Sequence, residues 1–363
     1  MPKLHKYQDS DNNRKQLLGF YREVYSTIPE MTIKSRFEWQ SFKNPNETSD
    51  ETPLIWVLQN ESNSLVGHNS LLKYNLIIGG DRYNGYCSTN LLVIPGTEGK
   101  GLGHILIGNN ESQPGVAFAV GITIMASRAF QKRGWVLIED AKLHTLIKHQ
   151  YKTLRFLKQS VVLSLLATPV LKFIEYCLTL RRQIACPPLP QGVESRMISE
   201  FESRWDSYWQ QFLSDYAIHY EREAAFLNYK YFSRNDVKHR AFIFERNDEP
   251  VGYLVIRKST SKLKNITLGR IVDLVYNPQL GFDLVASMVA FAIDEFKKYN
   301  VDSIVAVSSS AEISKAFRVN GLMFKKTQPA IILESDFSIE TLRKKYKNIW
   351  YIMLSDSDMD NYW

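Results

Sequence analysis

The feature that most constrains this chain is a pattern that occurs twice along it. The segments SRFEWQSFKNPN, LVG, LLVIP and SRAFQKRGW follow one another in the first half, and AAFLNYKYFSRND, PVG, DLVYNP and SKAFRVNGL follow in the same order in the second. The spacing is also similar, since 28 residues separate Gly67 from Pro95 and 26 separate Gly252 from Pro278. Four landmarks that recur in order at similar distances predict two copies of one domain.

Within each copy, helical and strand-like patterns alternate. In the first copy we expect helices at 12–27, 32–45, 104–110 and 125–134, strands at 54–59, 86–95, 115–122 and 135–138, and a hairpin at 65–78. This order favours an α/β (α+β) class in which each copy is a twisted mixed sheet flanked by helices. The Pro/Gly-rich segment CPPLPQG lies between the copies. We therefore predict a first domain over 1–150, an apolar helical connector and linker over 151–192, and a second domain over 193–363.

Composition is that of a globular protein with room for two ordinary domains. The 363 residues are 44% hydrophobic and 23% charged. A net charge of +7 permits an anionic partner, although a solvated basic surface explains it equally well. Three cysteines without CxxC spacing argue against a disulfide framework and against a zinc site, and we expect no metal. The first residues contain no apolar signal core, which favours a cytoplasmic protein.

The stretch VVLSLLATPVLKFIEYCLTL, residues 161–180, has about the length of a membrane span. Lys172, Glu175 and the helix breaker Pro169 lie inside it, so that a buried or amphipathic inter-domain helix is favoured over a span. Contact with a membrane surface stays open as an alternative, because basic residues flank the stretch at Lys148, Lys152, Arg155, Lys158, Arg181 and Arg182.

A glycine-rich turn follows an apolar run at residues 93–106, VIPGTEGKGLGHIL. Successive backbone N–H groups at such a turn, next to the start of a helix, can bind an anion. A dinucleotide loop would read G-x-G-x-x-G, with an acid about twenty residues later, and a nucleoside-triphosphate loop would end in G-K-[ST]. Lys100 is followed by Gly101, and neither pattern matches. From the residues alone, two interpretations of the turn stay open: a phosphate site of another kind, or a tight turn that binds no ligand.

This turn resembles the acyl-CoA loop of the GNAT N-acetyltransferases, V-x-P-x-x-[RQ]-G-x-G-x-[GA]. The later stretch TIMASRAFQKRGW, from Thr123 to Trp135, is similar to the family's second cofactor segment, N-x-x-A-x-x-x-[YF]-x-k-x-G-[FW]. As a whole the chain resembles bacterial tandem GNAT proteins with a degenerate second domain, some of which are associated with surface-polysaccharide pathways. The resemblance implies two tandem GNAT-like domains and acetyl-CoA or a longer acyl-CoA as co-substrate.

The resemblance also implies roles for particular residues. Backbone N–H groups in the turn would hold the CoA pyrophosphate, and the preceding strand end would pair with the pantetheine amides as an added strand does. An N–H near Val93 would polarise the thioester carbonyl. The cofactor-binding residues expected on this basis are Leu91, Leu92, Val93, Glu98, Gly99, Lys100, Gly101, Leu102, Gly103, Thr123 and Phe130.

Three positions depart from the family pattern. Glu98 replaces the usual Arg or Gln beside the pyrophosphate, although Lys100 next to it offsets the charge. Phe130 stands where many members have a Tyr that protonates the departing thiolate. In the second copy the loop is NPQLGFDLV, with Gly281 as its only glycine. We therefore expect weakened CoA binding in the first copy, and a structural or acceptor-site role for the second.

A base is needed to take a proton from an attacking amine. The candidates are Glu139 and Asp140, which follow the strand 135–138 and also suit a helix start, and Tyr86, which also suits a core. His68 is a weaker candidate. Asp273 is the most unusual, because a charge within an apolar strand is costly unless it is paired. It would pair with Arg270 or face the cleft between the copies. The terminal LSDSDMDNYW is interpreted as an acidic tail rather than a calcium loop.

Taken together, these patterns predict an N-acyltransferase that works by direct attack in a ternary complex. The acceptor would be a small-molecule, saccharide or peptide amine, and the apolar stretch 161–180 also allows a fatty acyl donor or a lipid-linked acceptor. Nucleic acid is not an expected partner. Two alternatives remain: a tRNA-dependent aminoacyltransferase of the peptidoglycan-bridge type, and a non-catalytic GNAT scaffold. The basic charge permits the tRNA-dependent enzyme but the CoA-like loop of the first copy disfavours it, and Glu98 and Phe130 are the residues that best support the scaffold.

Overall fold

The computed structural model describes residues 2–25, 28, 30–46, 53–97, 99–148, 160–261 and 265–356, and for residues 139, 140, 175, 178, 179, 181, 183, 185 and 261 it describes the backbone alone. The first copy contains β1 (Lys3–Lys6), α1 (Asp11–Val24), α2 (Glu30–Phe42), β2 (Ile55–Gln59), β3 (Leu65–Ile78), β4 (Asp81–Val93), α3 (Leu102–Gly108), β5 (Val116–Val120), α4 (Ile124–Gln131) and β6 (Val136–Ile147). The long helix α6 (Val161–Ala185) follows.

The second copy contains β7 (Val193–Ile198), α7 (Trp209–Phe212), β8 (Tyr216–Tyr220), α8 (Ala224–Phe232), β9 (His239–Arg246), β10 (Glu249–Ser261), β11 (Ile266–Tyr276), α9 (Gly281–Lys297), β12 (Ser303–Ser308), α10 (Ala311–Val319), β13 (Met323–Ile332), α11 (Ile339–Lys345) and β14 (Asn348–Trp350). Strands β7 and β9 to β13 follow the order of β1 to β6, and α8, α9 and α10 stand where α2, α3 and α4 do. The domain boundaries at residues 150 and 192 stay a prediction.

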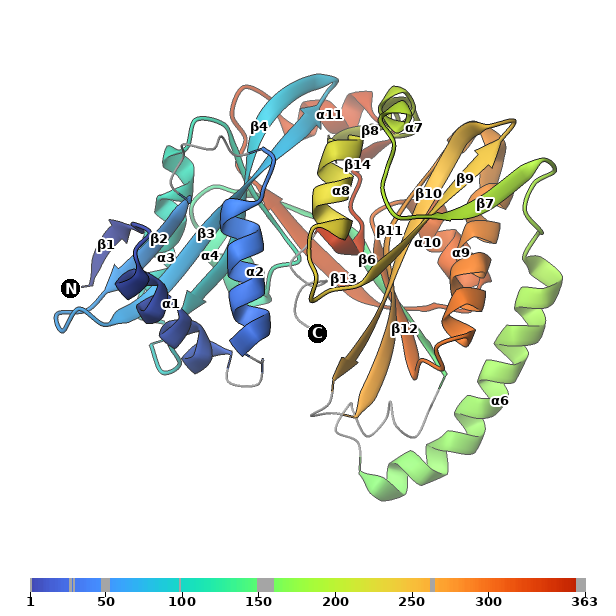
Figure 1. The fold of residues 1–363 in the computed structure, drawn as a ribbon, viewed down its shortest axis with the longest axis horizontal. Helices are drawn as coiled ribbons and strands as arrows, with labels where there is room; N and C mark the ends of the chain where they lie inside the picture. Colours follow the sequence, from blue (N-terminus) through green and yellow to red (C-terminus); the bar gives the residue numbers. More distant parts are fainter. Residues whose placement is uncertain are drawn as a thin grey trace.

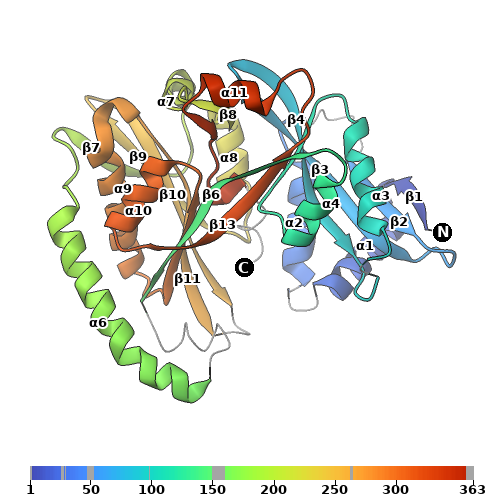
Figure 2. The same ribbon diagram turned by 180° about the vertical axis from the view of Figure 1, so that it is seen from behind.

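One mixed sheet runs through the molecule in the order β1-β2-β3-β4-β5-β13-β6-β12-β11-β10-β9-β7 (Figure 1). Its centre is an exchange of strands. β13 pairs with β5, from Ala330↔Val120 to Ile332↔Phe118, and β6 pairs with β12, from Ser303↔Ile147 to Ser308↔Lys142. β6 and β13 also pair with each other, and Figure 2 shows them crossing between the two halves. The last strand of each copy therefore completes the sheet of the other.

Two predicted elements of the first copy are longer than expected. Residues 65–78 form the single strand β3, and the hairpin lies between β3 and β4, where Gly79 and Gly80 have φ of +65° and +103°. β3 stays extended because it pairs with β2, β4 and β8 in turn. The strand predicted at 135–138 continues to Ile147, so that Glu139 and Asp140 lie within β6 and not at a helix start.

The larger of the two main apolar cores lies under α9. Buried side chains recur on this helix at Leu284, Met288, Ala292 and Phe296, a spacing that places them on one face against β10 and β11. A second core, around Leu76 and Phe118, lies between the first copy and the segment after α11. Burying each such side chain contributes about 1.5–3 kcal/mol.

Helix α6 confirms the predicted helix at 161–180 but not its burial between the copies. It runs along the outer side of the second copy (Figures 1 and 2), and most of its large apolar side chains are exposed. Among the described residues, no helix combines the length and the apolar character needed to cross a membrane.

Candidate functional site

The two neighbouring strands β4 and β5 separate partway along their length. They pair in parallel only at Gly85↔Val116, Tyr86↔Ala117 and Cys87↔Phe118. Beyond this point β4 continues along β3 as far as Val93, whereas β5 continues along β13. Within the described residues, no strand pairs with the other edge of β4 from Ser88 to Val93, and the two strands form an open V.

A β-bulge in β4 lies inside this V. The register with β3 passes from Ser70↔Thr89 to His68↔Leu92, so that Asn90 and Leu91 face one residue of β3, and Asn90 has φ of +51°. The N–H of Ile94 donates to Val66 O at 3.1 Å. Because N–H groups alternate between the two edges of a strand, that of Val93 is directed toward the open edge.

His68 holds the bulge from the β3 side. Its Nδ1 lies 3.0 Å from Asn90 O, and its Nε2 lies 3.1 Å from the hydroxyl of Tyr21 on α1. A carbonyl can only accept, so Nδ1 carries the proton and Nε2 accepts from Tyr21. Burial, aided by the nearby Arg36 and opposed by the hydrogen bond to Asn90, lowers the pKa of His68 to about 4. The imidazole is therefore neutral at pH 7, and its contacts make it a structural link.

The glycine turn follows the end of β4. Gly99 and Gly101 both have φ of +79°, and a Cβ at either position would meet nothing within 4 Å, so the space above the turn is open. Lys100 is exposed, whereas Leu102 is buried and anchors the start of α3. Glu98 lies outside the described residues. The turn therefore presents bare backbone at the mouth of the V.

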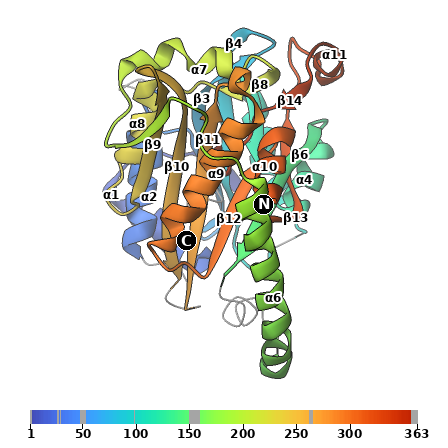
Figure 3. The ribbon, with the colours of Figure 1, turned by 90° about the vertical axis from the view of Figure 1, so that its right-hand side faces the viewer.

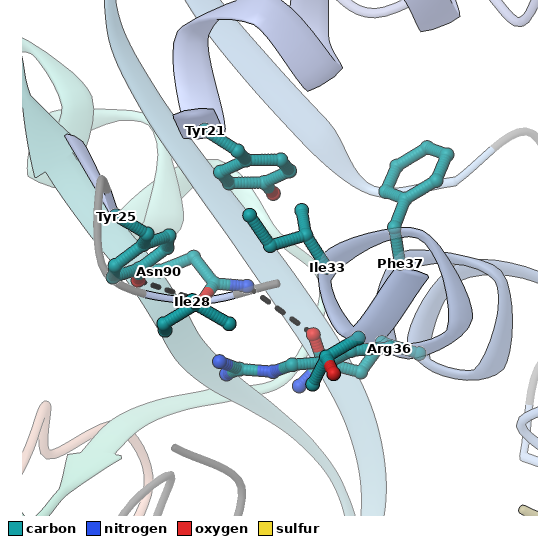
Figure 4. A pocket seen from close by; sticks show the side chains of 9 residues that line it. Tyr21, Tyr25, Ile28, Ile33, Arg36, Phe37 and Asn90 are labelled. Atoms are coloured by element: carbon teal, nitrogen blue, oxygen red, sulfur yellow. Dashed lines mark hydrogen bonds between the residues drawn. The ribbon is translucent and has the colours of Figure 1, made fainter. Parts of the chain in front are cut away.

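A mostly apolar cavity opens beside the bulge, between α1 and α2 (Figure 4). Asn90 lies at its edge, where its side chain donates to Gln40 Oε1 at 3.2 Å and accepts from the Tyr25 hydroxyl at 3.4 Å. The cavity measures about 330 Å³ with its mouth included and is lined by Tyr21, Tyr25, Ile28, Thr32, Ile33, Arg36, Phe37, Gln40 and Asn90. We call it the apolar cavity.

A second cavity of about 550 Å³, open to solvent, lies between the two copies. The first copy contributes Trp39, Leu72, Tyr74, Cys87, Ser88, Thr89 and Val120, and the second contributes Lys230, Tyr231, Arg234, His239, Ser355 and Asp356. We call it the polar cavity. Thr89 lines this cavity and Asn90 lines the apolar cavity, so consecutive residues at the bulge open onto different spaces.

A buried charge network forms one wall of the polar cavity. Asp356 accepts from Arg222 at 2.7 Å and from Lys230 at 3.0 Å. Burial opposes its charge, yet these two cations hold the pKa of Asp356 below its ordinary value. The prediction of an acidic tail is therefore wrong for Asp356, whereas Asp358 and Asp360 lie outside the described residues.

Asp273 belongs to the same network. It accepts from the hydroxyls of Tyr231 at 2.7 Å and Tyr253 at 2.6 Å, and it lies 3.4 Å from Nε of Arg222. The expected partner, Arg270, instead donates to Ser259 at 3.1 Å. These contacts are on Oδ2, and Oδ1 accepts from the N–H of Leu274 at 3.0 Å. Asp273 is therefore placed to hold two tyrosines in position and not to read an acceptor directly.

Three other predicted residues have structural contacts. Tyr86 is buried with Leu102 and Leu106, and Phe130 packs against Trp135 with ring centroids 4.6 Å apart. Thr123 caps α4 by accepting from the N–H of Ala126 at 3.1 Å. The side chains of Glu139 and Asp140 lie outside the described set.

His239, in the polar cavity, was not found from the sequence, because no local motif marks it. Its Nδ1 lies 3.1 Å from Tyr231 O. A carbonyl can only accept, so Nδ1 carries a proton and donates to Tyr231 O.

The equivalent V of the second copy is filled by the chain itself. The N–H of Ser309 donates to Ile352 O at 3.0 Å, Met353 forms a bridge with Ser308, and the hydroxyl of Tyr351 donates to Leu274 O. The segment 351–356 thus lies between β11 and β12, where the first copy is open.

Comparison with known proteins gives structural likeness alone. No protein-family model matches the chain, and no curated protein matches it in sequence. Saccharomyces cerevisiae N-myristoyltransferase, solved with bound myristoyl-CoA, is similar over 91% of this chain and 82% of its own, with a TM-score of 0.59 and 11% identity. A GCN5-related N-acetyltransferase from Anabaena variabilis (TM-score 0.55, 12% identity) covers 91% of this chain and 72% of its own.

A probable N-acyltransferase from Enterococcus faecalis is also similar, with a TM-score of 0.54 and 11% identity over 91% of this chain and 72% of its own. These structures share the large twisted mixed sheet flanked by helices. The chain therefore has the fold of the GNAT N-acyltransferases.

Proposed function

We propose that this chain is an acyl-CoA-dependent N-acyltransferase. The observation that carries the proposal is the open edge of β4 from Ser88 to Val93, next to a bulge and a bare glycine turn. An extended chain with amide groups can bind such an edge as a strand would. The GNAT fold supports the proposal, as does the myristoyl-CoA bound in the yeast structure of the same fold.

In this proposal the pantetheine arm lies along Leu91, Leu92 and Val93, and the pyrophosphate lies at the turn. Backbone N–H groups of Gly99, Gly101, Leu102 and Gly103 face it, and Lys100 adds a positive charge. The thioester carbonyl then lies at the bulge, where the N–H of Val93 stabilises the oxyanion that forms on attack.

The two cavities beside the bulge suit the two other parts of the reaction. The apolar cavity takes the acyl chain, because aromatic and aliphatic side chains line most of it. The polar cavity takes the amine acceptor, because it carries charges of both signs and opens to solvent. The second copy contributes the acceptor side and does not bind CoA, since the segment 351–356 fills its own V.

Transfer proceeds by direct attack in a ternary complex. The nitrogen of a neutral amine attacks the thioester carbonyl carbon and forms the new C–N bond. The tetrahedral intermediate collapses, the C–S bond breaks, and the electron pair leaves on the CoA sulfur. His239, which lines the polar cavity, is the group proposed to take the proton that the amine loses, and solvent protonates the thiolate, since Phe130 has no proton to give.

The cofactor site is tested by calorimetric titration of CoA, acetyl-CoA and myristoyl-CoA against wild type and Gly101→Asp. A matched control is Gly281→Asp, because Gly281 has φ of +75° and a Cβ there would also meet nothing within 4 Å. Binding that is lost in Gly101→Asp and kept in Gly281→Asp is expected. Binding of none of the three by wild type, or equal loss in the two variants, would contradict the proposed site.

The role of His239 is tested by turnover with a panel of amines at saturating acyl-CoA. His239→Asn is expected to lower kcat about 10²-fold or more, with acyl-CoA affinity unchanged. An unchanged kcat would remove His239 from the mechanism. CoA binding without turnover of any amine would favour the non-catalytic scaffold.

A further inference from the structure

Helix α6 carries its apolar side chains on the outside. It begins after Ser160, whose hydroxyl accepts from the N–H of Leu163 at 3.1 Å, and its 25 residues extend for about 37 Å. Large side chains that are at least 59% exposed recur along it at Val162, Leu165, Leu166, Val170, Phe173 and Tyr176. The covered positions include the small residues Ser164, Ala167 and Thr168. A helix that packs on a protein core has the reverse arrangement.

The helix is attached to the second copy mainly near its end. Arg182 forms an ion pair with Asp294 of α9 at 3.0 Å, and the thiol of Cys186 lies 3.4 Å from Ala286 O. Figure 3 shows that the beginning of α6 extends past the lower edge of the sheet. The exposed apolar row lies mostly before residue 177, and it is therefore on the part of the helix farthest from these contacts.

Charge in the surrounding sequence favours an anionic partner. Between Lys148 and Cys186 the sequence contains seven Lys and Arg and one Glu, a formal charge of +6, whereas the whole chain carries +7. Along the sequence, most of the net positive charge of the protein thus lies within and directly beside the helix that carries the exposed apolar row. Apolar side chains that are flanked by basic ones match the interface of a bilayer that contains anionic lipids.

We propose that α6 binds an anionic membrane surface, lying in the plane of the interface with its exposed apolar row in the lipid. Lys172 and Pro169 within the helix agree with an in-plane position and not with a span. A second copy of the chain is the weaker occupant, because pairing two α6 helices would bring two segments of +6 together. Anionic lipid instead neutralises that charge. The inference does not depend on the proposed acyltransfer.

The test is co-sedimentation of the full-length protein with vesicles of phosphatidylcholine alone and of phosphatidylcholine with phosphatidylglycerol. We expect binding to the anionic vesicles, weakened by raising NaCl from about 0.1 M to about 0.5 M. Leu166→Glu and Phe173→Glu are each expected to reduce partitioning at least about tenfold, because each takes an apolar side chain out of the lipid and adds a negative charge. Lys172→Glu should reduce it less.

The matched control is Met31→Glu, at an 82% exposed methionine on α2, remote from α6 (Figure 1). It introduces the same charge and should leave partitioning unchanged. Equal loss in Met31→Glu and Leu166→Glu would contradict a role for α6 and point to net charge alone. Absence of vesicle binding, together with a dimer in sedimentation equilibrium that Leu166→Glu dissociates, would overturn the proposal in favour of self-association.

Discussion

The buried His68 makes the stability of this protein depend on pH in a direction that can be calculated. The folded chain holds this histidine neutral, with its pKa lowered from 6.5 to about 4 by burial, whereas the unfolded chain exposes it. Below pH 6.5 the unfolded state therefore binds more protons than the folded state, and stability rises with pH. The contribution of His68 is fully present above pH 6.5 and is lost as the pH falls toward 4, up to about 3 kcal/mol.

The perturbation that isolates this contribution is His68→Gln. Between about pH 7.5 and about pH 5, wild type should lose about 2 kcal/mol more of its free energy of unfolding than the variant does. Other groups titrate in both proteins and cancel in the difference. The measurement is guanidinium denaturation followed by circular dichroism at four or five pH values, with the two free-energy curves subtracted.

A control separates burial from the mere presence of a histidine. The comparison variant is His5→Gln, which also removes one histidine, from an exposed position on β1, and its free-energy curve is measured in the same way. Parallel curves for wild type and His68→Gln would refute the reasoning, since they would mean that His68 is protonated to the same extent in the folded and unfolded chains. If the free energy of unfolding of His68→Gln depended more steeply on pH than that of wild type, the predicted direction of the effect would be wrong.

Three further predictions concern packing and charge. Asp273→Asn should lower the free energy of unfolding by about 3–5 kcal/mol in denaturant titration, because Arg222 loses a buried partner, whereas Asp294→Asn, at an exposed ion pair, should cost about 1 kcal/mol or less. Gly115→Ala should lower the free energy of unfolding by about 1–3 kcal/mol, since its Cβ would lie 2.3 Å from the backbone oxygen of Asn84. Gly19→Ala, within α1, should raise it by about 0.5–1 kcal/mol, because a Cβ there would meet nothing within 4 Å. Tyr351→Ala should lower the thermal midpoint and increase the binding of a hydrophobic dye, because it opens the gap between β11 and β12; unchanged dye binding would contradict the filling role of residues 351–356.

Local pattern was sufficient to predict most elements of the first copy. The strand 54–59, the glycine turn and the helix at 125–134 follow from side-chain periodicity and from Gly and Pro positions, which act over a few residues. The GNAT fold was predicted from the turn and the segment that ends at Trp135. The family resemblance implied that the strand end at Leu91–Val93 would pair with pantetheine, but the separation of β4 from β5 was not predicted.

What the sequence did not reveal depends on pairing between distant segments. β6 is longer than its apolar run WVLI because β12 and β13 supply partners on its two sides, and nothing near Glu139 encodes them. Asp273 and Asp356 are paired through Arg222, which is far from each in sequence. His239 reaches the cavity only once α8 and β9 pack together. The exposure of α6 was missed because apolar content alone cannot distinguish a buried helix from an uncovered one.

The exchange of β6 and β13 has a consequence for how the chain can be divided. Cutting between residues 148 and 193 would give two polypeptides, each carrying a final strand whose neighbours lie in the other. In each piece alone, the final strand would lack its hydrogen-bonding partners, and the exposed strand edges would favour aggregation. Expressed together, the two should reassociate as complementary fragments, as in a domain-swapped pair held together by a tether. We therefore expect the two copies to fold as one cooperative unit, so that the chain cannot be shortened to a single stable copy.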